Sequence, residues 1–188
     1  MKKYAVFGLV FAVAAVWSMC SSQVEAGPEQ ISIAGDLPRI GHLSQEDLEK
    51  LGPVDIEFTL KERTHTFHGV PVDKVLEHFG FDKGPETPET PPREKRTGWR
   101  KVLVASAPDG FQAVFSCAEV VQSMGATKAY LAWKMDGKDL PTDAGPFRLV
   151  VPSDQERARS IYRLNRIDVV DMQKIIPPAT GENKSASH

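Results

Sequence analysis

The sequence predicts an α+β domain in which hairpins of a mixed β-sheet alternate with short capped helices. Strands are indicated by alternating apolar and polar residues, hairpin turns by Asp-Gly dipeptides, and helix starts by serine or proline caps. Because the helices are inserted between hairpins, this order favours α+β over a doubly wound parallel sheet.

The first predicted strand runs from Val54 to Leu60, where every second residue is apolar, so one of its faces is expected to be buried. Segments 102–105 and 111–115 flank a Pro-Asp-Gly turn at 108–110 and are predicted to form a hairpin. The remaining predicted strands are 130–134, before a second turn at Asp136-Gly137, then 147–151 and 167–170.

Short helices are predicted from their caps. Ser44 caps the first, with Asp47 at the third helical position. Pro71 fits the first turn of a second helix, which carries apolar residues at helical spacing up to residue 79. Ser116 and Glu119 are expected to form a capping box for the third.

The N-terminal residues are predicted to be a signal peptide, residues 1–26. Lys2 and Lys3 precede an almost wholly apolar stretch, and Val24-Glu25-Ala26 has small residues where signal peptidase cleaves. The apolar run is too short for a comfortable membrane span, so we expect an exported, bacterial periplasmic protein with no stable span after cleavage. The alternative is a lipoprotein anchored through Cys20.

The mature chain is expected to hold one domain, residues 27–176, with a flexible insert at 83–98 and a disordered tail at 177–188. The insert has four prolines, many charges and no apolar residue. The formal net charge of the whole chain is −2, which gives no case for a nucleic-acid partner.

Motifs in order along the chain resemble the sulfite-oxidase-type molybdopterin-binding domain. They are the segments FHGVPVDKVLEHFG (Phe67 to Gly80), DGFQAVFSCAEV (Asp109 to Val120) and GPFRLVVP (Gly145 to Pro152), followed by an arginine-rich segment and a last strand. The resemblance covers residues 43–170. It implies the sulfite oxidase fold and makes molybdopterin a possible cofactor.

The chain departs from the pattern that the resemblance implies for catalytic members. Those proteins ligate molybdenum through a cysteine near the end of the early strand, whereas Phe58 to Arg63 reads FTLKER. Ser153 and Glu156 stand at positions where catalytic members carry glycine. The n-region also lacks the twin arginines that export of a folded, cofactor-loaded protein requires. No cofactor is therefore favoured.

Cys117 is the only cysteine left after cleavage and is a weak candidate for a catalytic or metal-ligating thiolate. At the first position of a predicted helix, backbone N–H groups would lower its pKa. A small buried residue is the favoured alternative, because free cysteine is among the most buried residue types.

Arg148 and Arg159 match, by resemblance, basic positions near the phosphate of the cofactor. Arg148 lies between Phe147 and Leu149 in an apolar strand, so its guanidinium needs an anion or a carboxylate such as Asp143 or Asp168. A solvated basic face is the alternative for Arg159 and its neighbours.

Other residues that could carry chemistry give weaker signals. His65 and His68 complete no recognisable metal-ligand spacing, so no metal site is predicted. Trp133 is expected in the core, while Trp99 and Tyr162 could line a cleft.

Two functions remain open. The first is a binding or accessory module for a small anionic ligand or a periplasmic partner protein. The second is a molybdopterin-dependent oxidoreductase of the sulfite oxidase type.

Overall fold

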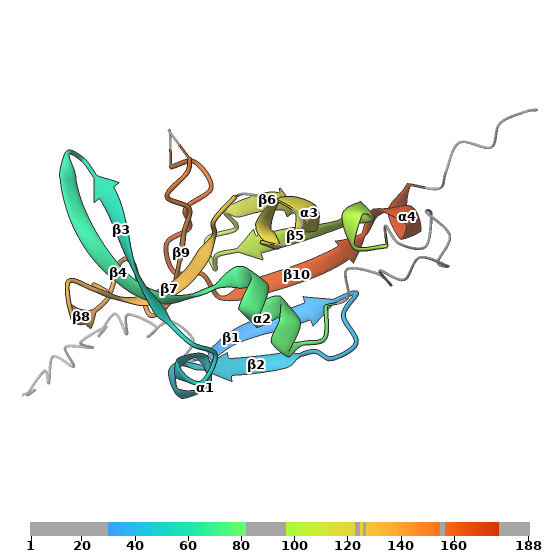
Figure 1. Cartoon of the computed structure of the whole chain (residues 1–188), viewed down its shortest axis with the longest axis horizontal. Helices are drawn as coiled ribbons and strands as arrows, with labels where there is room; N and C mark the ends of the chain where they lie inside the picture. Colours follow the sequence, from blue (N-terminus) through green and yellow to red (C-terminus); the bar gives the residue numbers. More distant parts are fainter. Residues whose placement is uncertain (1–29, 82–96, 123–124, 126, 155–156, 177–188) are drawn as a thin grey trace, which may run out of the picture.

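The chain folds into an α+β domain with two five-stranded β-sheets and few short helices (Figure 1), as the sequence predicts. A computed structural model describes residues 30–81, 97–122, 125, 127–154 and 157–176. The predicted signal peptide and tail lie outside these residues, as does nearly all of the predicted insert.

The first sheet joins the two ends of the domain. Its strands, in spatial order, are β2 (Gly41–Ser44), β1 (Gln30–Gly35), β10 (Arg166–Asp171), β5 (Lys101–Ser106) and β6 (Gln112–Ser116). β1 pairs with β10 in parallel, with Ile33 opposite Ile167, and the other pairs are antiparallel. The β5–β6 hairpin confirms the prediction, but β1 and β2 were not predicted.

The second sheet carries the long β3–β4 hairpin, which extends away from the rest of the domain on the left of Figure 1. Its strands are β3 (Val54–Leu60), β4 (Arg63–Pro71), β7 (Tyr130–Met135) and β8 (Lys138–Asp139), with β9 (Arg148–Val150) paired to β7. Ile56 and Phe58 of β3 are buried while Asp55 and Glu57 are exposed, as the alternation predicts.

The described helices are α1 (Gln45–Glu49), α2 (Val72–His78), the 3-10 turn η2 (Gly98–Arg100), α3 (Cys117–Val120) and α4 (Met172–Ile175). The α1 capping box between Ser44 and Asp47 is confirmed. Pro71 lies at the N-cap of α2, one position before the predicted first turn. Gly98 begins η2 and is buried.

The predicted capping box of α3 does not form. Ser116 caps the helix, but its hydroxyl accepts a hydrogen bond from Ala118 N. The Glu119 carboxylate instead pairs with the Arg159 guanidinium, which comes from the loop before β10. A charged long-range partner has therefore displaced the local contact that the spacing predicts.

Two apolar clusters hold the domain together. The larger one lies between the sheets and includes Ile33, Leu103, Phe115, Trp133 and Leu149. The smaller one lies on the other face of the second sheet and consists of the buried residues Ile56, Phe58, Phe67, Ala132 and Val150. Because β9 alternates, it contributes to both clusters.

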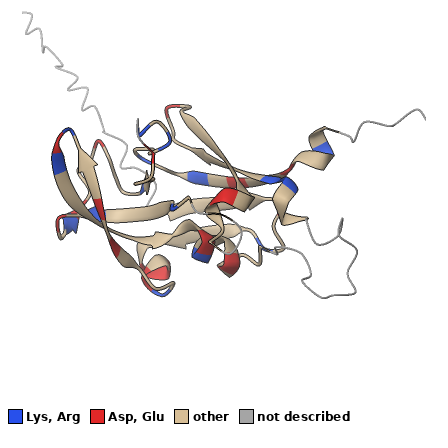
Figure 2. Ribbon diagram, turned by 45° about the horizontal axis from the view of Figure 1, so that its top comes forward, with Lys and Arg blue, Asp and Glu red and all other residues tan. Residues whose placement is uncertain are grey.

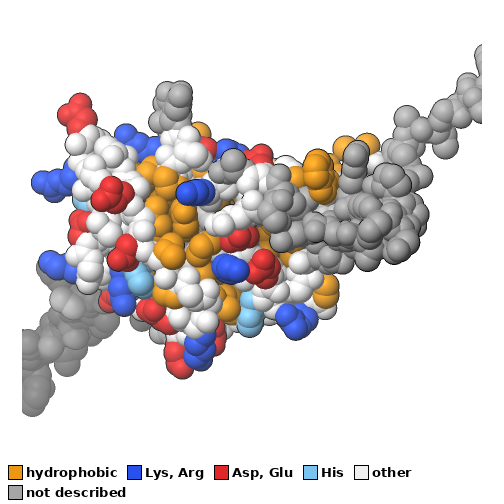
Figure 3. Space-filling model, viewed as in Figure 1, with side chains coloured by type: hydrophobic (Ala, Val, Ile, Leu, Met, Phe, Trp, Pro, Cys, Tyr) orange, Lys and Arg blue, Asp and Glu red, His pale blue; other side chains and the backbone are white. Residues whose placement is uncertain are grey.

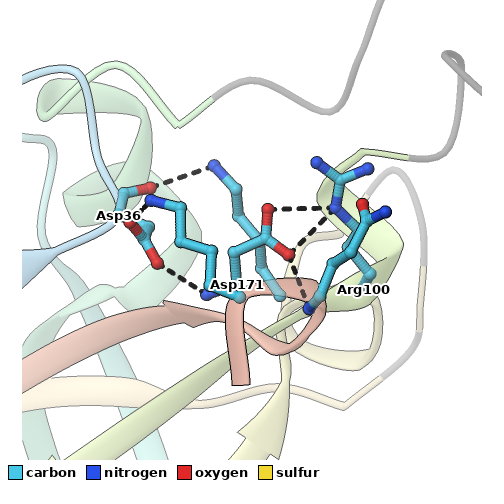
Figure 4. A network of polar contacts seen from close by, with 6 residues as sticks. Asp36, Arg100 and Asp171 are labelled. Atoms are coloured by element: carbon cyan, nitrogen blue, oxygen red, sulfur yellow. Dashed lines mark hydrogen bonds and ion pairs between the residues drawn. The ribbon is translucent and has the colours of Figure 1, made fainter. Parts of the chain in front are cut away.

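A polar network ties the ends of β1, β5 and β10 together (Figure 4). Asp36 accepts hydrogen bonds from Asp171 N at 2.8 Å and from Lys174, and its backbone oxygen accepts one from Lys101 Nζ at 3.0 Å. Arg100 Nε donates to both carboxylate oxygens of Asp171, at 2.9 and 3.0 Å. This network fixes the C-terminal helix α4 to the sheet.

None of the helices in the described part of the chain has the length and apolar character to cross a membrane.

Candidate functional site

Arg148 is a charged side chain buried in an apolar strand. It lies at the start of β9 and is only 2% exposed. Its neighbours Phe147 and Leu149 pack into the larger cluster, while Val150 joins the smaller one. The predicted alternation is therefore confirmed, and it directs Arg148 towards the smaller cluster.

Aromatic rings surround the Arg148 guanidinium. Its Cζ atom lies 4.0 Å from the centre of the Tyr162 ring, 5.1 Å from that of Phe67 and 6.0 Å from that of Phe58. Each ring presents an electron-rich face that attracts a cation. Arg148 thus sits between the β3–β4 hairpin and the loop that precedes β10.

No carboxylate in the described residues neutralises Arg148. The Nε atom is buried and has no hydrogen-bond partner there. Asp168, one of the two expected partners, instead accepts two hydrogen bonds of 2.6 Å from Arg166, and no ion pair joins Arg148 to Asp143 within the described part of the chain. Burial lowers the pKa of Arg148, against an opposing effect of the Tyr162 hydroxyl, and the charge of Arg157 lowers it further.

Two clefts open beside the rings that contact Arg148. One of about 320 Å³ lies between the β3 edge and the loop after β9, and its lining residues are Glu57, Phe58, Thr59, Pro152, Asp154 and Arg157. The other, of about 250 Å³, is lined by Asp109, Phe111, Ser160, Ile161 and Tyr162. Arg157 forms no ion pair with any described residue and brings a positive charge to the lining of the first cleft, which also includes the carboxylates of Glu57 and Asp154.

Arg159 has a different environment. Its Nε and Nη2 atoms each donate to a carboxylate oxygen of Asp154 at 2.8 Å, and Nη1 donates to Glu119. These hydrogen bonds raise its pKa, and its guanidinium also lies 4.5 Å from the Phe115 ring centre. Arg148 and Arg159 therefore do not share a set of contacts, and Arg159 has its charge offset by two carboxylates.

Cys117 is fully buried at the start of α3, within the larger cluster. Burial raises the pKa of its thiol to about 12, which outweighs the nearby charge of Lys101. A thiol in this state is a poor nucleophile at neutral pH, and its fully buried side chain presents no surface to a ligand. Cys117 also shares none of the ring contacts that surround Arg148, so it lies apart from that arginine.

The two histidines of β4 have separate partners. His65 Nδ1 lies 2.7 Å from Asp136 Oδ2, and His68 Nδ1 lies 2.8 Å from Asp55 Oδ1. No group of three potential metal ligands occurs among the residues that the structure describes.

The expected aromatic residues divide between core and surface. Trp133 is buried, as predicted, and its Nε1 donates to Glu49 at 3.2 Å. Tyr162 is about half exposed and lines a cleft, while Trp99 is exposed on η2.

The tip of the β3–β4 hairpin falls in the FTLKER segment. Lys61 and Glu62 form its turn, with φ angles of 45° and 68°. Two successive positive φ angles suit Asn-Gly, and a Lys-Glu pair adopts them with strain. The sequence carries no Asn-Gly or Asp-Gly pair at this turn.

The surface around the hairpin combines apolar and charged areas. Figure 3 shows a hydrophobic area in the middle of one face, beside the β3–β4 hairpin, with charged side chains at its margin. Figure 2 shows that Lys and Arg are interspersed with Asp and Glu along the described elements.

Residues 30–175 match the family model described as the oxidoreductase molybdopterin binding domain. No curated protein sequence matches the chain significantly. Among solved structures, it is similar to the sulfane dehydrogenase SoxCD from Paracoccus pantotrophus, with a TM-score of 0.53 and 18% sequence identity. The match covers 79% of this chain but only 40% of the SoxCD chain.

Proposed function

The chain belongs to the oxidoreductase molybdopterin binding domain family, and we propose that it is an exported member that binds a small anion without molybdenum. The proposed site is the cleft between β3 and the loop after β9, where Arg157 lines the wall and Arg148 lies behind Phe58. We propose that the protein acts as a binding or accessory module in the periplasm.

The observation that carries this proposal is the buried charge of Arg148. A guanidinium that is 2% exposed, with no carboxylate partner in the described residues, costs free energy unless something offsets it. Three aromatic rings offset part of that cost. A bound anion would offset more, because a charge interacts more strongly at low effective dielectric.

The residues that could serve as metal ligands in this chain argue against a molybdenum ion in the proposed cleft. The family's catalytic members supply a thiolate from the region that here reads FTLKER. The buried Cys117, with its raised pKa, is unsuited to replace it. Arg159 is held by two carboxylates and so has little left to offer a cofactor phosphate. We therefore derive no reaction step through a molybdenum cofactor.

Calorimetric titration of the purified protein with sulfate and phosphate at low ionic strength tests the proposal. Binding of at least one of these anions with 1:1 stoichiometry, lost in Arg157→Gln, is the expected result. As a matched control, Arg39→Gln removes an exposed arginine that donates to the backbone oxygen of His78, and it should bind as the parent does. If neither anion binds the parent protein, or Arg157→Gln binds unchanged, the anion site is wrong.

A further inference from the structure

The outer strand of the first sheet, β6, presents an open edge. It is last in the spatial order of that sheet and runs along its upper rim in Figure 1. Val114, at its centre, is 54% exposed, and Phe111 just before it is 49% exposed. An exposed edge strand is a template on which another strand can pair.

The backbone groups that β6 presents can be assigned from the hairpin. Ala107 N donates to Phe111 O at 2.9 Å, so these residues form a hydrogen-bonded pair. Since such pairs alternate along an antiparallel ladder, Ala113 and Phe115 bond to β5. The backbone groups of Gln112 and Val114 therefore point away from β5, while Ser116 is the N-cap of α3 and its carbonyl belongs to the start of that helix. No other described segment forms a backbone hydrogen bond with these residues.

The other strand edges are protected in ways that β6 is not. β3 carries the exposed charges Asp55 and Glu57, and β8 is a two-residue Lys-Asp strand. The outer edge of β9 is already occupied, because Leu149 and Ile161 exchange backbone hydrogen bonds of 2.9 and 3.0 Å. β2 has only four residues and begins with glycine. The β6 sequence QAVFS has no charge and no proline, which are the usual protections of an edge.

We infer that β6 is a homodimer interface, at which β6 of one chain pairs antiparallel with β6 of a second copy. Placing the two-fold axis at Val114 aligns each copy of this residue with the other as a hydrogen-bonded pair. Gln112 then faces Ser116 of the other copy, so a polar side chain meets a polar one. No like charges oppose each other along β6 in this arrangement. In β3, by contrast, a two-fold axis at Glu57 would place the Glu57 carboxylates of the two copies opposite each other.

The side chains on the outer face of the sheet also favour a second copy as the occupant. Val104 of β5 lies directly opposite Val114 on this face and is partly buried. The dimer would place the two Val104–Val114 pairs side by side on one face, so that the two Val114 side chains contact each other across the two-fold axis. The two first sheets would become one continuous sheet.

The mass of the purified protein in solution gives the first test, by sedimentation velocity at about 100 µM. The parent should sediment as a dimer. Val114→Lys puts two ammonium groups at the two-fold axis, so the variant should sediment as a monomer. The shape of its thermal melting curve should not change. Val54→Lys is the matched control, because it makes the same substitution at an exposed valine on the β3 edge. It should remain dimeric.

A cysteine at residue 114 gives a test that depends on the strand register. Hydrogen-bonded antiparallel pairs have Cα atoms about 5.5 Å apart, within the range that a disulfide spans. Val114→Cys should therefore form an intermolecular disulfide on mild oxidation, whereas Gln112→Cys alone should not. The native Cys117 thiol should not interfere, because it is fully buried.

Either of two results would overturn the inference. A parent protein that sediments as a monomer at this concentration would exclude the dimer. A parent dimer that persists in Val114→Lys, or that cross-links through Gln112→Cys and not Val114→Cys, would place the interface elsewhere. These measurements do not depend on whether an anion binds near Arg148.

Discussion

Replacing Arg148 with methionine separates a ligand-binding arginine from one that stabilises the fold. The change keeps much of the side-chain volume and removes a buried charge that no described carboxylate neutralises. It also removes a cation from above the Tyr162 ring, a contact with an estimated value of about 1–2 kcal/mol. Since removing a desolvated charge gains a similar amount, we expect the free energy of unfolding to change by less than about 1 kcal/mol.

The effect on binding should be larger. The Arg148 Cζ atom lies 6.0 Å from the centre of the Phe58 ring, and this ring lines the proposed cleft. For an anion about 7 Å away at an effective dielectric of about 20, Coulomb's law gives roughly 2.4 kcal/mol. A direct charge-assisted hydrogen bond would contribute a similar amount, about 1.5–3 kcal/mol. Arg148→Met should therefore weaken anion binding by roughly 50-fold.

Thermal melts with and without sulfate or phosphate measure both effects. In the parent, an anion at about 100 times its Kd should add about 2.7 kcal/mol of stability. In Arg148→Met the melting temperature without anion should lie within about 4 °C of the parent, and the anion-dependent increase should be largely lost. Arg39→Gln should keep the full increase. A large fall in melting temperature for Arg148→Met, with no anion-dependent increase in the parent, would refute this reasoning and leave Arg148 as part of the fold.

Three further predictions follow from the structure. Arg159→Gln leaves two carboxylates without their partner and should lower the free energy of unfolding by about 1 kcal/mol in urea titrations, while Arg166→Gln, which breaks a more exposed pair, should change it by less than about 0.5 kcal/mol. The thiol pKa of Cys117 is raised from 9.0 to about 12, so its contribution to stability is present below pH 9 and is lost as the pH rises towards 12; the stability of Cys117→Ala should fall less over this range, and an equal fall would contradict the buried thiol. Replacing Lys61-Glu62 by Asn-Gly should raise the free energy of unfolding by about 1 kcal/mol, because the turn has positive φ angles at both positions, and no gain in calorimetry would argue against strain there.

Local patterns predicted the parts of the fold that local interactions determine. The Ser44 cap and the turn at Asp136-Gly137 were found because a few neighbouring residues suffice to form them. The parallel pairing of β1 with β10 was missed because it joins residues such as Ile33 and Ile167, which lie far apart in the chain. The alternation of Ile31 and Ile33 was a signal for β1 that could have been used.

In the candidate site, too, the sequence predicted what depends on neighbouring residues and missed what depends on residues far apart in the chain. The position of Arg148 in an apolar strand predicted that it would be buried and in need of a partner. Its aromatic environment comes from β3, β4 and the loop before β10, and no local spacing could reveal that combination. Arg159 was grouped with Arg148 by resemblance, but Glu119 and Asp154 approach it only in the folded chain.

Elemental analysis of the protein purified from its native host, together with a fluorescence assay for released pterin, tests whether this family member works without molybdenum. We predict less than about 0.05 molybdenum atoms per chain and no pterin, because Cys117 is fully buried and the FTLKER segment supplies no thiolate. About one molybdenum atom per chain, accompanied by a stoichiometric pterin, would contradict the account and identify the protein as a molybdopterin-dependent oxidoreductase.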